Sequence, residues 1–203
     1  MSTGRRGRLI ALEGGEGCGK STQAALLAER LGVLLTREPG GTAIGEQVRA
    51  LLLDPATAGL APRAEALLMA AARAQHVAEV IRPALDAGRD VVTDRWVGSS
   101  LAYQGHGRGL PVADVAAVSA FAVDGVTATV VVLLDVPAGE AAARRSGTSA
   151  DRLEREGGGF HGRVAEGFAA LAAADPGRWV LVDGTGDPAE VAERVWAAVE
   201  PRL

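Results

Sequence analysis

Cysteine, lysine, asparagine and long apolar runs are scarce or missing in this sequence of 203 residues. The single cysteine, Cys18, allows no intramolecular disulfide and no cysteine-cluster metal site, and the three histidines are too dispersed to indicate one. The longest apolar run, residues 127–134, is far shorter than the ~20 residues that cross a bilayer. The basic residues 1–8 are followed by no apolar signal segment. These absences predict a cytoplasmic protein that contacts no membrane.

The charge balance argues against nucleic acid as a partner. The chain has 21 Lys and Arg residues against 25 Asp and Glu residues, a net charge of −4 at pH 7. A groove for DNA or RNA would have to be built against that overall field. Because 203 residues, 48% of them hydrophobic, are enough for one self-sufficient core, we expect a single domain over residues 1–203.

Patterns typical of buried strands alternate along the chain with patterns of helical period. Strands are expected at residues 8–13, 33–36, 90–93, 128–135 and 179–183. Helices are expected at residues 20–31, 44–53, 62–87, 111–123, 138–145, 160–174 and 188–199. This alternation predicts an α/β fold of three layers, α/β/α, around a five-stranded parallel sheet. Residues 144–159 are rich in charge and glycine, which is typical of a solvated loop or of a mobile lid over an active site.

Residues 14–21, GGEGCGKS, match the phosphate-binding loop pattern G-x-x-x-x-G-K-[ST] between an expected strand and an expected helix. In such a P-loop the glycines let backbone N–H groups surround the phosphates, the lysine reaches phosphate oxygens, and the serine hydroxyl binds Mg²⁺. The only lysine of the chain, Lys20, stands at the position that demands one. The sequence therefore predicts a P-loop NTPase-type fold that binds nucleotide phosphates through Gly14, Gly15, Glu16, Gly17, Cys18, Gly19, Lys20, Ser21 and Thr22.

A magnesium ion at this loop needs a second oxygen ligand from a neighbouring strand. Asp94 and Asp135 both end apolar runs, and Asp94 is the better candidate because Arg95 follows it. That pair is suited to metal on one side and phosphate on the other. We expect Ser21 and Asp94 to organise Mg²⁺, partly through water, whereas Asp135 is typical of a helix entry.

The missing residue types exclude several classes of nucleotide-binding protein. A GTPase needs an Asn-Lys-x-Asp segment to recognise its base, and this chain has no asparagine and no second lysine. A protein kinase needs an asparagine for its second metal ion, and partition-type ATPases need a further lysine in the loop. Small-molecule phosphoryl transfer remains, and Arg37, Arg49 and Arg73 lie where they could bind a second phosphate or a base edge.

Five segments together resemble the ordered motifs of bacterial thymidylate kinases. They are residues 13–22 (EGGEGCGKST), 36–42 (TREPGGT), 94–96 (DRW), 99–105 (SSLAYQG) and 151–154 (DRLE). The resemblance covers most of the chain and implies the reaction ATP + dTMP → ADP + dTDP, with Mg²⁺, in a homodimer formed by helix packing.

The resemblance also implies roles for individual residues. Arg95, Arg37 and Arg49 would bind the dTMP phosphate, Glu16 would lie near the sugar 3′-hydroxyl, and Tyr103 would crowd the 2′ position. Arg73, Ser100 and Gln104 would hydrogen-bond the base. The full set of expected substrate-binding residues is Glu16, Arg37, Glu38, Arg49, Met69, Arg73, Arg95, Ser100, Tyr103 and Gln104.

Three residues depart from the family's usual pattern. Met69 stands where a phenylalanine usually stacks on thymine, Trp96 replaces a tyrosine, and Gly98 stands where an aspartate is common. Methionine can cover a ring face but has no planar stacking surface. The first departure keeps open a rival function, phosphorylation of another or modified pyrimidine nucleotide. A rival of another class is a nucleotide-binding regulatory protein without transferase activity.

The P-loop carries Glu16 and Cys18 where some thymidylate kinases have an arginine that reaches the transferred phosphoryl group. Another cation must then stabilise the transition state, and residues 144–159 supply Arg144, Arg145, Arg152 and Arg155. Among these we expect Arg152 to be the catalytic arginine, with Arg145 as the second candidate. Lys20, Arg95 and Asp94 complete the expected catalytic set.

Overall fold

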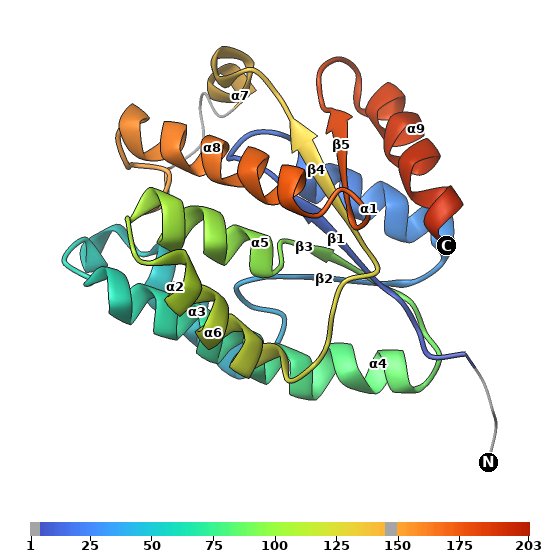
Figure 1. Ribbon diagram of the computed structural model, residues 1–203, viewed down its shortest axis with the longest axis horizontal. Coiled ribbons are helices and arrows are strands. Elements are labelled where there is room, and N and C mark those ends of the chain that lie inside the picture. The colour runs from blue at the N-terminus through green and yellow to red at the C-terminus, as the bar shows by residue number, and fades with distance from the viewer. Residues whose placement is uncertain (1–4, 145–149) are drawn as a thin grey trace.

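Five strands form one sheet in which every paired strand is parallel, in the order β2-β3-β1-β4-β5 (Figure 1). This is a computed structural model, and it describes residues 5–144 and 150–203. The strands are β1 (Leu9–Glu13), β2 (Leu34–Arg37), β3 (Val91–Asp94), β4 (Val130–Asp135) and β5 (Trp179–Asp183). The prediction of a five-stranded parallel sheet is confirmed, and each strand lies within two residues of its expected bounds.

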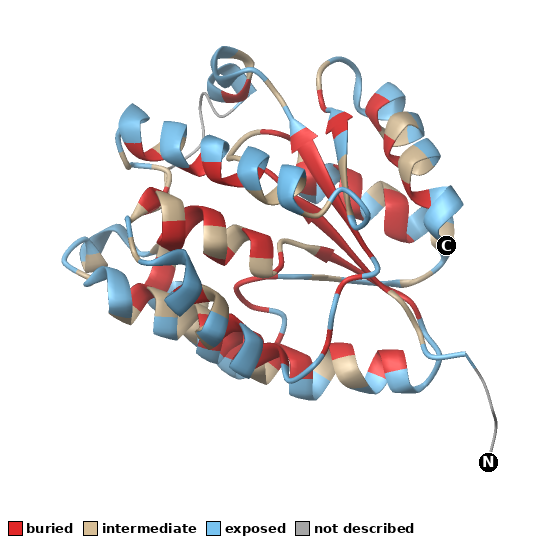
Figure 2. Cartoon of the chain, viewed as in Figure 1, coloured by how far each residue is buried: buried red, intermediate tan, exposed pale blue. Residues whose placement is uncertain are grey.

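Helices cover both faces of the sheet, as predicted for three layers (Figure 1). One face packs against α1 (Lys20–Leu31) and α9 (Pro188–Val199) through a core of aliphatic side chains. The other face carries α3 (Pro62–His76), α4 (Arg82–Asp86), α5 (Val97–Ser100), α6 (Val112–Val123) and α8 (Gly158–Ala174). Helix α2 (Ala43–Leu53) packs on α3, and α7 (Ala138–Arg144) follows β4. Figure 2 shows the central strands buried and the outward helix sides exposed. No helix among residues 5–144 and 150–203 is long and apolar enough to cross a membrane.

The single helix expected over residues 62–87 is interrupted in the structure. Helix α3 passes into a π-helical stretch, η2 (Val77–Ile81), before α4 begins. Pro83 has no N–H for the usual bond to the preceding turn, and the Arg82 N–H bonds to the Val77 carbonyl, five residues earlier. The proline therefore widens the helix without ending it.

A helical segment follows β3 where the sequence analysis expects no regular element. It consists of α5 and the π-helical η3 (Leu101–Gly107). Glycine and serine are poor helix formers, so propensity gives little signal here. Contacts stabilise the segment instead: the Glu13 carboxylate accepts the N–H groups of Trp96 and Ser99 at 3.0 and 2.9 Å and so satisfies donors at the helix start.

The expected lid is described only in part. Helix α7 ends at Arg144, residues 145–149, with Arg145 among them, lie outside the described residues, and the chain continues from Ala150. The backbone N–H of Arg152 bonds to the Leu53 carbonyl at 3.0 Å, so this part of the chain packs on the end of α2. The mobility of residues 144–159 stays a prediction.

Candidate active site

A cavity of about 670 Å³ opens at the carboxyl ends of β1, β2 and β3, the edge of a parallel sheet where ligands bind. The structure brings most of the predicted site residues together in its wall. They are Glu16, Gly17, Gly19, Lys20, Ser21, Thr22, Arg37, Glu38, Arg49, Met69, Arg73, Asp94, Arg95, Ser100, Tyr103 and Gln104. Gly14, Gly15, Cys18 and Arg152 do not line it.

The P-loop joins β1 to α1 and has the conformation that its glycines allow. Gly19, with φ of 91°, precedes the first turn of α1, and a Cβ on Gly14 would lie 2.7 Å from the Leu134 carbonyl oxygen. Lys20 is the first residue of α1 and is 6% exposed, with its Nζ donating to the Gly15 carbonyl at 2.6 Å. The loop therefore gathers a helix N-terminus and one ammonium group at the cavity wall.

Ser21 and Asp94 meet across the gap between α1 and β3. The Ser21 hydroxyl donates to Asp94 Oδ2 at 2.5 Å, and Asp94 Oδ1 is buried without a hydrogen-bond partner among the described residues. Two oxygen donors, one of them unsatisfied, fit Mg²⁺, which takes few protein ligands and completes its shell with phosphate and water. Asp94 lines the cavity that holds the P-loop, whereas Asp135 lines a different, mostly apolar cavity.

Glu16, Arg95 and Tyr103 form a compact charged cluster on the cavity wall. Arg95 Nη2 lies 2.5 Å from Glu16 Oε1, and the Tyr103 hydroxyl donates to the same oxygen at 2.7 Å. Burial alone would raise the pKa of Glu16, but the charges of Arg95 and Lys20 outweigh it and lower the pKa to about 2. Glu16 is thus a carboxylate at all physiological pH values.

Arg37 and Arg49 extend the positive charge on the same wall. Arg49 Nη1 donates to the Pro39 carbonyl at 2.8 Å, and Arg37 pairs with Glu46 at 2.9 Å. Burial and then the charge of Arg37 lower the pKa of Arg49. Cations that repel one another in this way are stabilised by an anion, so this end of the cavity suits a phosphate group.

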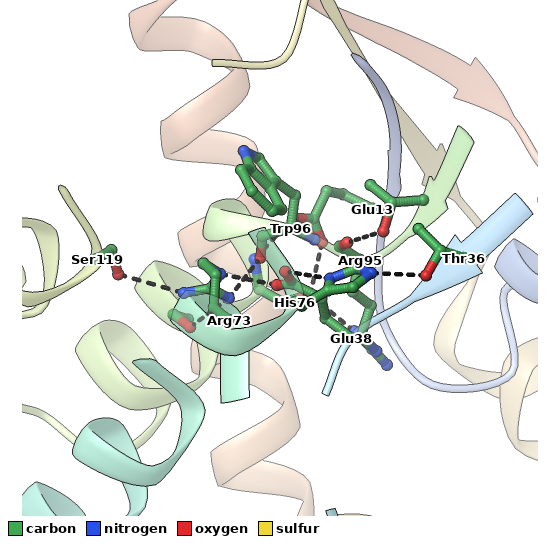
Figure 3. Close-up of polar contacts among 11 residues, drawn as sticks. Glu13, Thr36, Glu38, Arg73, His76, Arg95, Trp96 and Ser119 are labelled. Carbon is green, nitrogen blue, oxygen red and sulfur yellow. Dashed lines mark hydrogen bonds and ion pairs between the residues drawn. The ribbon is translucent and has the colours of Figure 1, made fainter. Parts of the chain in front are cut away.

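Arg73 lines the cavity and is 3% exposed, and its polar partners are drawn in Figure 3. Its Nε donates to Glu38 at 2.7 Å, and its Nη2 donates to the Ser100 hydroxyl at 3.0 Å and to the Trp96 carbonyl at 3.2 Å. Ser119 lies 3.5 Å from Nη1, which leaves that nitrogen with donor capacity for a ligand.

Behind Arg73 lies a polar chain that the sequence analysis did not identify. His76 is fully buried, with Nδ1 3.1 Å from Glu38 and Nε2 2.6 Å from the Thr36 hydroxyl (Figure 3). The chain links the end of β2 to α3 and fixes Glu38, which in turn fixes Arg73. The only advance signal is that His76 lies three residues after Arg73 on the expected helix.

Glu13 is a second buried group that the sequence analysis gave no role. Besides the two N–H groups at the start of α5, it accepts the Ser99 hydroxyl at 2.5 Å, and Ser99 accepts from Arg95 Nη1 at 3.0 Å. Burial raises the pKa of Glu13 to about 7. Glu13 therefore positions Arg95, whose backbone φ of 74° is unusual for a residue with a side chain.

Arg152, the arginine expected to be catalytic, is not part of the cavity wall, although its neighbours Asp151 and Leu153 are. Arg152 is 5% exposed, with Nη1 2.7 Å from Glu65 and Nε donating to the Leu52 carbonyl at 2.8 Å. Arg144 does line the cavity, and its Nη1 lies 3.8 Å from the place where a Cβ on Gly19 would be. An ion pair with a buried carboxylate holds Arg152, and its catalytic role stays a prediction.

The cavity wall thus carries two groups of positive charge, a carboxylate paired with one of them, and one oxygen pair suited to Mg²⁺. Lys20 and the helix N-terminus suit one phosphate chain, and Arg37, Arg49 and Arg95 suit another phosphate. Such an arrangement can hold a phosphate donor and a phosphorylated acceptor side by side, which is the requirement for phosphoryl transfer.

Comparisons with known proteins agree with this chemistry. A family model described as "Thymidylate kinase" matches residues 12–195. A curated thymidylate kinase from Synechococcus sp. (strain JA-2-3B'a(2-13)) is 52% identical over 201 residues, covering 96% of this chain and 95% of the relative. One from Trichlorobacter lovleyi is 48% identical over 206 residues, covering 96% and 97%. A crystal structure of thymidylate kinase from Ehrlichia chaffeensis superposes with a TM-score of 0.80 at 30% identity, covering 96% of this chain and 99% of that one.

Proposed function

This chain belongs to the thymidylate kinase family and is a nucleoside monophosphate kinase that converts dTMP to dTDP with ATP; we propose that the cavity residues divide this work as follows. The P-loop and Lys20 hold the ATP phosphates, and Arg37, Arg49 and Arg95 hold the dTMP phosphate. The observation that carries this assignment is that the wall of one cavity contains both the P-loop lysine and a group of three arginines. Each of them suits one of the two phosphate groups that must meet.

Glu16 and Tyr103 recognise the sugar of dTMP. Glu16 stays ionised and accepts a hydrogen bond from the 3′-hydroxyl, while Arg95 balances its charge. Tyr103 is 3% exposed and packs edge-on against Phe160 and Phe168. A ring held this firmly excludes a 2′-hydroxyl by volume, which favours deoxyribose.

Ser21 and Asp94 are the residues that would hold Mg²⁺, and the ion would neutralise charge on the ATP phosphates. No cluster of three or more ligating side chains occurs in the described part of the chain. Two protein oxygens are the expected number for an ion that is bound mainly through nucleotide phosphates.

The base lies at the Arg73 end of the cavity. Arg73 donates to a base carbonyl with Nη1, Ser100 and Gln104 complete the polar contacts, and Met69 covers the ring face. Met69 also packs against the core cluster that contains Tyr103 and Leu153, so it is held against the cavity wall.

We further propose that the enzyme is a homodimer through the outer faces of α2, α3 and α6. Large apolar side chains stand exposed there: Phe121 is 89% exposed, Leu67 58% and Leu51 54%. These helices pack on one another, so the three side chains belong to one helical layer. A second copy of the chain would cover them.

A panel of nucleoside monophosphates tests the proposed function. ADP release is measured with ATP, Mg²⁺ and dTMP, dUMP, dCMP, dGMP or dAMP, with Lys20→Ala as the control for the ATP site. We expect dTMP to give the highest kcat/KM and Lys20→Ala to lower turnover by at least a thousandfold. Preference for another pyrimidine nucleotide, or no turnover with any of them, would overturn the proposal.

A further inference from the structure

Glu65 is a fully buried carboxylate on α3 that does not line the cavity. Three side chains from other parts of the fold donate to it. Gln104 Nε2 lies at 2.9 Å, Arg108 Nε and Nη2 at 3.2 and 3.0 Å, and Arg152 Nη1 at 2.7 Å. Buried carboxylates in proteins are hydrogen-bonded and paired, and one that is fully buried does not act as a surface charge.

The donors keep Glu65 ionised. Burial would raise its pKa, but the hydrogen bonds from Arg108 and Gln104, together with the charge of Arg108, lower the pKa below its ordinary value. An ionised carboxylate has no proton to donate and can only accept hydrogen bonds. Every group that faces Glu65 must therefore present an N–H or O–H group.

This requirement fixes the side-chain amide of Gln104. The two ends of a glutamine amide have the same shape but opposite hydrogen-bonding character, and the NH₂ end must face Glu65. The carbonyl oxygen is then turned the other way, and the bond to Glu65 is the side-chain hydrogen bond that Gln104 makes within the described part of the chain. Gln104 is 1% exposed and lines the base end of the cavity with Arg73 and Ser100.

We propose that Glu65 is a positioning residue that sets base specificity by holding the Gln104 carbonyl oxygen toward the pyrimidine ring. There the oxygen accepts the N3–H of thymine or uracil and repels the N3 lone pair of cytosine. This inference rests on the proposed function, because it takes the base to bind at the Arg73 end of the cavity. A site built to accept one hydrogen bond rejects a ligand that leaves its buried acceptor unpaired.

The proposal also explains where Arg152 lies. Arg152 and Arg108 together supply the positive charge that keeps Glu65 ionised. Arg152 comes from a segment that packs on the end of α2, where its Nε donates to the Leu52 carbonyl. Arg108 is further paired with Glu156 at 2.5 Å. Arg152 thus acts on the base end of the cavity through Glu65.

The test compares Glu65→Gln with Glu156→Gln, the same chemical change on the other carboxylate that pairs with Arg108. KM and kcat are measured for dTMP, dUMP and dCMP, and dissociation constants are measured for the three nucleotides without ATP. In Glu65→Gln the Gln104 amide can turn, so we expect the ratio of kcat/KM for dTMP to that for dCMP to fall at least tenfold. The change is expected in KM and in the dissociation constants for dTMP and dUMP, with kcat within about threefold. Glu156→Gln should keep the wild-type ratio.

A double variant covers the case in which Glu65→Gln removes a charged partner from both Arg108 and Arg152 and the protein does not fold. Glu65→Gln with Arg108→Met removes both partners of one pair, which costs less than removing one, and Arg108→Met alone is its control. The double variant should lose dTMP selectivity and Arg108→Met should keep it. An unchanged ratio in a folded variant that carries Glu65→Gln overturns the inference while leaving the kinase assignment intact. Wild-type protein that does not act on dTMP overturns the proposed function instead.

Discussion

Arg144 and Arg152 differ so much in environment that alanine substitutions should separate catalysis from stability. Arg144 lies beside the P-loop, its side chain is 29% exposed, and its Nη2 contacts Glu140 at 2.5 Å and the Gly184 carbonyl at 3.0 Å. Arg152 is buried against Glu65, whose side chain has no exposed surface. We expect Arg144→Ala to lower kcat and Arg152→Ala to lower the free energy of unfolding.

The magnitudes follow from these contacts. An exposed i,i+4 ion pair is worth about 0.3–0.5 kcal/mol, so Arg144→Ala should change the free energy of unfolding by less than about 1 kcal/mol. Removing one partner of a buried ion pair costs about 3 kcal/mol, which is the loss expected for Arg152→Ala. An arginine that stabilises the transferring phosphoryl group contributes on the order of 10³–10⁵ in kcat. Arg144→Ala should therefore lower kcat by at least a hundredfold.

The assay is coupled ADP release for kcat and urea unfolding for stability, both at a temperature where each variant is folded. Arg155→Ala is the matched control, because Arg155 is exposed and its side chain donates to the Ala150 carbonyl alone among the residues that the structure describes. A hundredfold loss of kcat in Arg152→Ala, with unfolding unchanged, would refute the reasoning and restore the preference drawn from the sequence. If Arg144→Ala keeps kcat within a few-fold, the transition-state charge comes from another group.

Three further predictions concern the base, the buried carboxylate of β1 and the helical face. Met69→Phe should lower the KM for dTMP by up to about tenfold through stacking and leave the KM for ATP unchanged; an equal effect on both substrates would assign Met69 to the core. The pKa of Glu13 rises from 4.5 to about 7 on folding, so its contribution to stability is full below pH 4.5 and is lost as the pH rises through 7. Glu13→Gln should reduce the loss of the free energy of unfolding, measured with urea, between pH 5 and 8. An unchanged dependence on pH would contradict the raised pKa of Glu13. Phe121→Asp should convert the proposed dimer to a monomer in sedimentation experiments without unfolding the chain, whereas an unchanged sedimentation coefficient would contradict a dimer interface at this face.

The sheet and the nucleotide loop could be predicted because their signals are local. A fully apolar run followed by glycines and a helical period identifies β1, the P-loop and α1 from some twenty consecutive residues. The pairing of Ser21 with Asp94 was also predictable, since parallel strands end at one edge and a carboxylate at a strand end must lie there. The homology motifs then supplied the residues that line the cavity.

The supporting residues could not be predicted because their partners are far away in the chain. Glu13 and Ser99 are separated by 86 positions, and Gln104 and Glu65 by 39. No spacing rule connects such pairs, and a glutamate on a helix is ordinarily a solvated residue. The same reason explains Arg152. The many charged residues around it in the sequence predict a solvent-exposed side chain, whereas in the fold it forms an ion pair with the buried carboxylate of Glu65.

The departure at Gly98 has a cause in packing that is independent of the substrate. A Cβ at this position would lie 2.6 Å from a ring carbon of Trp179 and 2.8 Å from Glu13 Oε1, closer than real Cβ atoms come. An aspartate there would also bring a second carboxylate against Glu13, which is buried and already accepts three hydrogen bonds. Gly98 does not line the cavity, whereas Met69 and Trp96 do, and the Arg73 guanidinium lies 5.7 Å from the Trp96 ring centre. Trp179 and Glu13 leave no room for a side chain at position 98, which accounts for the glycine there. Differences in base recognition between this enzyme and its relatives should therefore arise at Met69 and Trp96.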